Sequence, residues 1–178
     1  MPGGRIDSER EFTSLGIAVL TVSDSRNESN DTSGDLLAAR ITGAGHQLRA
    51  RALAGHEKAG IQRVIEAWIQ DSAIDVIIAN GGTGLLPRDV SPEAIREFFD
   101  REFEGFAALW HLMSYESVGV STLQSRACAG IARGTLLYVL PGSNGACRDG
   151  WDKLISLQID SRFRPCSAIE LLPRFQKR

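Results

Sequence analysis

Three nearly continuous runs of apolar residues constrain the fold of this chain more than any other feature. The runs are LGIAVLTV at Leu15–Val22, IDVIIA at Ile74–Ala79 and TLLYVL at Thr135–Leu140. A strand with one solvated face alternates apolar and polar residues, so these runs indicate strands buried on both faces. Such strands are typical of parallel sheets that are covered by helices on both sides.

Further segments have the spacing of elements that complete this layout. The expected elements are a helix over DLLAARITGAG that ends at Gly43 or Gly45, a weaker edge strand at Gln47–Leu53, a helix at His56–Gln70, helical SPEAIREFF and GFAALWHLMSYE, and a long helix over Ala146–Ser161. Asp31, Thr32 and Ser33 are N-cap residue types, and Ser91 is the expected cap before Pro92. Buried strands alternating with amphipathic helices predict βαβ units.

Length and composition indicate one globular domain. The chain has 178 residues, of which 43% are hydrophobic and 24% charged, with a formal net charge of -2. That charge gives no overall attraction to nucleic acid or to an anionic membrane, and no apolar run approaches the length of a spanning helix. We expect a flexible N-terminal arm at residues 1–14, a single domain at residues 15–165 and a C-terminal extension at residues 166–178.

The three cysteines favour a reducing compartment. Cys128, Cys147 and Cys166 are odd in number and form no CxxC pair, so neither a disulfide framework nor a zinc knuckle is indicated. Buried reduced thiols in a cytoplasmic protein are the expected state.

Loops of unusual composition follow each of the three predicted buried strands. SDSR follows the first, GGTG the second and PGS the third. Ligands of open α/β sheets bind beyond the carboxyl ends of the strands, so the three loops are expected on one rim. This convergence predicts a binding site, although each loop alone is a weak signal.

The stretch NGGTGLLPRDVSPEA, Asn80 to Ala94, is the most informative of these loops. Glycines at a strand end allow backbone N–H groups to approach an anion, so GGTG is a candidate phosphate cradle. A tight strand-to-helix turn explains the tetrapeptide equally well. Neither a Walker A motif nor GxGxxG is present.

Charged residues near the cradle have two interpretations each. Asp89 is suited to holding Mg²⁺ or orienting a hydroxyl beside phosphate, or else to an Asx turn or helix cap. Arg88 is suited to pairing with phosphate or with Glu93. Arg126, in STLQSR, is suited to an anion or to a surface ion pair.

Taken together, the motifs resemble the MoaB/MogA family of molybdenum cofactor biosynthesis proteins, which is related to the gephyrin and plant Cnx molybdopterin-binding domains. TVSDSR, DTSG, GGTG with PRDVSPEA, REFEGF, STLQSRA and LPGS occur in the family's order between Leu15 and Pro165. The segment from ALWHLMSYE to the final RPC is closer to the MoaB branch. The resemblance implies a three-layer αβα sandwich with a mostly parallel central sheet.

The resemblance also implies a site and a chemistry. Active members adenylylate molybdopterin with Mg²⁺ and ATP, and Asp89 matches their essential acidic residue, which makes it the candidate catalytic and Mg²⁺-binding residue. Positions that match substrate-binding loops are Ser23, Asp24, Gly34, Gly81, Gly82, Thr83, Gly84, Ser125, Arg126, Pro141, Gly142 and Ser143. The family further implies a homo-oligomer, a trimer or a hexamer, and contact with other proteins of the pathway.

Three positions depart from the pattern of active members. His56 stands where an acidic residue is expected, Ala108 replaces a pterin-contacting carboxylate, and Asn80 replaces the usual threonine. Mg²⁺ prefers oxygen ligands, so His56 cannot simply inherit a magnesium-binding role. Two functions therefore remain open, a molybdopterin adenylyltransferase and a non-catalytic molybdopterin-binding or scaffolding oligomer.

Overall fold

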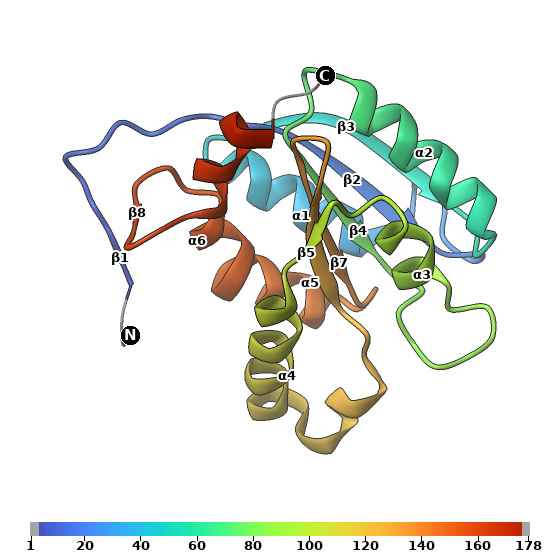
Figure 1. Cartoon of the computed structure of the whole chain (residues 1–178). Coiled ribbons are helices and arrows are strands. Elements are labelled where there is room, and N and C mark those ends of the chain that lie inside the picture. The colour runs from blue at the N-terminus through green and yellow to red at the C-terminus, as the bar shows by residue number, and fades with distance from the viewer. Residues whose placement is uncertain (1–3, 176–178) are drawn as a thin grey trace.

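The central element is a six-stranded sheet of mixed but mostly parallel strands (Figure 1). A computed structural model describes residues 4–175. The strand order is β3-β2-β4-β7-β6-β5, in which β3, β2, β4 and β7 are parallel and β6 and β5 are each antiparallel to the preceding neighbour. The strands are β2 (Gly16–Val22), β3 (Gln47–Ala54), β4 (Val76–Asn80), β5 (Arg101–Glu102), β6 (Cys128–Ala132) and β7 (Thr135–Leu140).

Helices cover both faces of this sheet. One face carries α1 (Thr32–Gly43), α4 (Glu104–Val118), α5 (Asn144–Gly150) and α6 (Ser156–Gln158), and the other carries α2 (Lys58–Gln70) and α3 (Ser91–Arg96). Successive residues of a strand point to opposite faces. Accordingly, Ile17 and Val19 of β2 join the core cluster under α1, whereas Leu20 joins the cluster under α2. The predicted three-layer αβα architecture is confirmed.

Local chemistry explains the first two helices. Asp31 is the N-cap of α1, and its carboxylate accepts from the N–H of Gly34 at 3.0 Å, which confirms its predicted capping role. In α2, Ile61, Ile65 and Ile69 recur on one face and are buried against the sheet. The prediction that Ser91 caps α3 is wrong, because Ser91 is the first helical residue and its hydroxyl makes no cap hydrogen bond.

The main differences from the sequence prediction concern β6 and the last long helix. The strand β6, CAGIA, was not predicted; it forms a hairpin with β7 through Arg133 and Gly134, which have φ values of 48° and 84°. The long helix expected over Ala146–Ser161 is divided into α5, a π-helical turn at Trp151–Ile155 and α6.

The segments at both ends of the chain lie against the domain. The strand β1 (Arg5–Ile6), which lies within the expected N-terminal arm, pairs antiparallel with β8 (Phe163–Arg164). The expected C-terminal extension contains a 3₁₀ helix at Ala168–Phe175, in which Ile169 is buried and 8% exposed. Residues 1–3 and 176–178 of these predicted segments lie outside the described part of the chain. Among the described residues, no helix has the length and apolarity needed to cross a bilayer.

Candidate functional site

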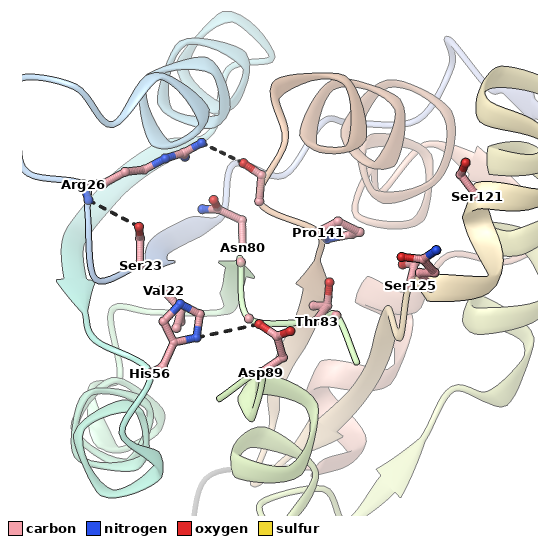
Figure 2. Close-up of a pocket in the computed structure, with 15 residues that line it drawn as sticks. Val22, Ser23, Arg26, His56, Asn80, Thr83, Asp89, Ser121, Ser125 and Pro141 are labelled. Carbon is pink, nitrogen blue, oxygen red and sulfur yellow. Dashed lines mark hydrogen bonds and ion pairs between the residues drawn. The ribbon is translucent and has the colours of Figure 1, made fainter. Parts of the chain in front are cut away.

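A cavity of about 380 Å³ opens at the carboxyl ends of β2, β4 and β7 (Figure 2). The three loops predicted to share one rim do meet there, because these strands are parallel neighbours. Predicted site residues that line the cavity are Ser23, Gly81, Gly82, Thr83, Gly84, Asp89, Ser125, Pro141 and Gly142. His56 and Asn80, two of the departures from the family pattern, line it as well.

The glycine loop has a conformation that side chains would obstruct. Gly81 and Gly82 have φ values of 97° and 65°, in the left-handed region that favours glycine. A Cβ on Gly81 would lie 2.2 Å from the carbonyl oxygen of Val22, and one on Gly142 would lie 3.0 Å from Cα of Gly81. The loops after β4 and β7 therefore touch backbone to backbone and form one wall of the cavity.

Backbone donors remain available in this loop. The N–H of Gly81 donates to Leu140, but the N–H groups of Gly82, Thr83 and Gly84 donate to no acceptor in the described part of the chain. Consecutive unpaired N–H groups with left-handed backbone are typical of anion-binding concavities. The loop thus has the chemistry of a phosphate cradle.

Arg126 holds the segment between the cradle and Asp89 in place. Its Nε donates to the carbonyl of Gly84 at 2.9 Å, and its two Nη groups contact the carbonyl of Asp89 and the carboxylate of Glu93. Glu93 is therefore paired with Arg126. The exposed side chain of Arg88 has no partner among the described residues.

Asp89 and His56 face each other across the cavity mouth (Figure 2). Oδ2 of Asp89 accepts from the N–H of Leu86 at 3.0 Å, while Oδ1 lies 3.9 Å from Nδ1 of His56. Nδ1 of His56 is 3.0 Å from the carbonyl of Arg88. Because a carbonyl only accepts, that contact places a proton on Nδ1. His56 therefore presents a donor to this part of the site rather than a lone pair for a metal.

A buried polar network supports the floor of the cavity. Asn80 donates to Thr21 Oγ1 at 2.9 Å and accepts from Ser33 Oγ at 2.7 Å, and Thr21 donates to Asp31 at 2.8 Å. Asp31 is 2% exposed. Burial opposes its ionisation, but hydrogen bonds from the Gly34 N–H, Thr21 and Arg51 outweigh burial and lower its pKa.

Arg26 is a cavity residue that the sequence analysis did not single out. Its guanidinium donates to the carbonyl of Gly142 at 2.9 Å and also contacts Ser33 and Asp31, so it joins the first loop to the third (Figure 2). Its place in the motif TVSDSR was the available signal.

Four predicted site residues lie outside the cavity lining, each with another contact. Asp24 accepts from the N–H of His56 at 3.1 Å, and Ser143 accepts from the N–H of Ala146 as the N-cap of α5. Gly34 permits the close approach of Asp31, since a Cβ there would lie 2.0 Å from Oδ2. Arg126 clamps the loop as described above. Ala108 is exposed on α4 and does not line the cavity.

Fold and site together define an α/β protein with a glycine-rich rim of unpaired N–H groups at the carboxyl ends of parallel strands. A family model described as a probable molybdopterin binding domain matches residues 18–161. The chain therefore belongs to the molybdopterin-binding domain family.

Individual relatives agree with this assignment. The chain is 44% identical over 157 residues to molybdenum cofactor biosynthesis protein B of Escherichia coli K12, covering 88% of this chain and 92% of the relative. It is 36% identical over 146 residues to a probable molybdopterin adenylyltransferase of Methanocaldococcus jannaschii, covering 78% and 86%. A crystal structure of a molybdenum cofactor biosynthesis protein B superimposes with a TM-score of 0.80 at 32% identity, covering 93% and 96%.

Proposed function

We propose that the chain acts in molybdenum cofactor biosynthesis by binding molybdopterin in the cavity at the ends of β2, β4 and β7. The observation that carries the proposal is the set of unpaired N–H groups at Gly82, Thr83 and Gly84, which lie in the wall of that cavity. The terminal phosphate of molybdopterin is an anion of the kind that such a loop binds. Ser23 and Ser125 line the same cavity. The hydroxyl of Ser125 accepts from Trp110, which leaves its own proton for donation to the polar pterin ring.

We further propose that the bound molybdopterin is adenylylated with Mg²⁺ and ATP. Mg²⁺ is commonly held by one or two carboxylates together with substrate phosphates and water. The carboxylate of Asp89 beside the cradle fits such a site, with Oδ1 free of any hydrogen bond from the described residues. The ion would neutralise charge on the transferring phosphoryl group. Asp89 would hold it there, and the cradle would orient the accepting phosphate.

The test is a product assay with purified protein, molybdopterin and Mg²⁺-ATP. We expect adenylyl-molybdopterin and pyrophosphate, and we expect Asp89→Asn to reduce turnover by about 10²–10³-fold. Asp152→Asn is the matched control, because Asp152 is an exposed acid paired with Arg40 outside the cavity lining. Equal turnover of the two variants would remove Asp89 from the mechanism.

A specific observation also favours a second candidate, a non-catalytic molybdopterin-binding protein. The imidazole Nδ1 of His56 lies 3.9 Å from Oδ1 of Asp89, at the place where a second carboxylate would strengthen metal binding. No cluster of three or more acidic, histidine or cysteine ligands occurs among the described residues. This candidate predicts calorimetric binding of molybdopterin without nucleotide turnover. Absence of molybdopterin binding would contradict both candidates.

We also propose that the protein is a homo-oligomer, a trimer or hexamer, that contacts other proteins of the pathway. The supporting feature is an exposed apolar surface on α4 and the turn after it, made of Leu109, Leu112, Tyr115, Val118, Val120 and Leu123. Surfaces of this kind are typical of interfaces. Light scattering should report a multimer that Leu112→Glu dissociates and Leu85→Glu, an equally exposed leucine elsewhere, does not. A monomeric parent protein would refute the proposal.

A further inference from the structure

A second cavity, of about 600 Å³, lies between the start of α4, the α6 helix and the C-terminal segment. It shares no lining residue with the first cavity. Its walls are mostly apolar, with contributions from Phe103, Phe106, Leu154, Leu157 and Leu171. The α4 helix is distant in the sequence from α6 and from the C-terminal segment, which is red in Figure 1. The volume lies within the ~300–1,000 Å³ that is typical of small-molecule sites.

Two buried hydroxyl groups in this cavity lack hydrogen-bond partners. Tyr138 on β7 is 2% exposed and Ser167 is 5% exposed, and both residues line the cavity. Neither Tyr138 Oη nor Ser167 Oγ has a hydrogen-bond partner within residues 4–175. Buried polar groups are nearly always paired, because an unpaired one loses its hydration without compensation. Two residues with unpaired hydroxyls line the same apolar cavity, which points to an acceptor that occupies it.

The charged residues around the cavity are compensated by neighbours. Glu170 contacts Arg10 at 3.2 Å and Arg164 at 3.6 Å, and Lys153 lies 3.4 Å from Asp149. Burial raises the pKa of Tyr138, so its hydroxyl stays protonated and able to donate at neutral pH. These charges select neither a strong anion nor a strong cation, whereas an uncharged acceptor matches the hydroxyl donors.

We propose that this cavity binds a small, uncharged hydrophobic molecule that carries a carbonyl-type acceptor. The acceptor receives the hydrogen bonds that Tyr138 and Ser167 otherwise lack, and the aromatic or aliphatic body packs against the apolar wall. The site is separate from the molybdopterin cavity and does not depend on the function proposed for it.

A fluorescent naphthalene ketone, 6-propionyl-2-(dimethylamino)naphthalene, is a suitable probe for the full-length protein. We expect saturable binding at one site per protomer with a blue-shifted emission. Gly105 lines the cavity, and a Cβ there would meet no atom within 4 Å, so Gly105→Phe should fold and obstruct the cavity. Gly43→Phe is the matched control, since Gly43 is also helical with open space around it but lies outside the cavity. The first variant should weaken binding by about tenfold or more and the second should not.

Two further readouts locate the probe and its acceptor. Cys166 is the exposed cysteine and lines the cavity, whereas Cys128 and Cys147 are buried, so bound probe should slow alkylation of Cys166 by iodoacetamide. Tyr138→Phe should weaken binding of the ketone by about fivefold and leave unchanged the binding of its analogue with CH₂ in place of the carbonyl.

Three outcomes would overturn the proposal. The first is the absence of saturable binding, and the second is equal affinity of the Gly105→Phe and Gly43→Phe variants. The third is probe binding that appears only on dilution into dissociated protomers, which would mean that a second copy of the chain covers the cavity.

Discussion

Nδ1 of His56 lies 3.9 Å from Oδ1 of Asp89 and 3.0 Å from the carbonyl of Arg88. The backbone of His56 is held as well, because its main-chain N–H donates to the carboxylate of Asp24. Among the described residues, Asp89 is the one acid that lines the cavity, and it has an imidazole beside it in the position where the family resemblance leads us to expect a second acid.

Replacing His56 with aspartate should strengthen metal binding at the site. A second carboxylate supplies the oxygen ligand that Mg²⁺ prefers, so we expect His56→Asp to raise Mg²⁺ affinity by about tenfold, measured by calorimetry with the protein and Mg²⁺-ATP. His56→Asn is the control, because it removes the imidazole without adding charge. If both variants bind Mg²⁺ equally, His56 does not limit metal binding.

Gly81→Ala should destabilise the protein and close the cradle. The residue has a φ of 97°, and a Cβ would lie 2.2 Å from the carbonyl of Val22, so the loop must shift away from β2. We expect a loss of about 1–3 kcal/mol in the free energy of unfolding, measured by urea denaturation. Gly43→Ala, where a Cβ has open space, should leave stability unchanged or slightly higher. Equal stability of the two variants would contradict the strained geometry assigned to Gly81.

Asp31→Asn should weaken the polar network beneath the cavity. It should also make the free energy of unfolding depend less on pH between pH 7 and pH 3. The carboxylate accepts from Thr21, Arg51 and the N–H of Gly34, and its pKa is lowered in the folded state. A lowered folded pKa gives stability that is present above the unfolded value of 3.8 and is lost as the pH falls through the folded value. We expect a loss of about 2 kcal/mol at pH 7.

The check is urea denaturation of parent and variant between pH 7 and pH 3. The difference between them should be largest at neutral pH and should shrink below about pH 4. A difference that is constant with pH would show that the charge of Asp31 contributes nothing and that only its shape matters.

The fold and the rim of the site were predictable because both depend on local signals. Continuous apolar runs mark β2, β4 and β7, and parallel strands place the following loops at one edge. The strand β6 was missed because CAGIA is short and rich in small residues, without a clear period of two. The π-helical turn at Trp151 interrupts a segment whose helical spacing continues through it.

The interior of the site was less predictable because it depends on register between strands. Thr21 and Asn80 are 59 residues apart and hydrogen-bond because β2 and β4 pair them directly. Arg26 reaches Gly142 only when the first and third loops converge. Sequence spacing also could not show that Arg126 holds the loop in place, since two of its three acceptors are carbonyl groups that carry no sequence signature.

His46 should make stability depend on pH near neutrality. It is 6% exposed, and its Nδ1 accepts from the N–H of Leu15 at 3.2 Å, so the folded state favours the neutral ring. Burial lowers its pKa, although the charge of Asp160 opposes that effect. A base with a lowered folded pKa contributes stability that is present above the unfolded value of 6.5 and is lost as the pH falls towards the folded value.

His46→Asn isolates this contribution, because its side-chain oxygen can accept from Leu15 but does not titrate near neutrality. The melting temperature of the parent protein should be several degrees lower at pH 5.5 than at pH 7.5, and this difference should be smaller in the variant. The parent protein loses stability at the lower pH because His46 binds a proton in the unfolded chain, whereas the buried ring of the folded state stays neutral. Parallel pH profiles for the two proteins would mean that His46 titrates alike in both states, in conflict with its burial against Phe12 and Trp151.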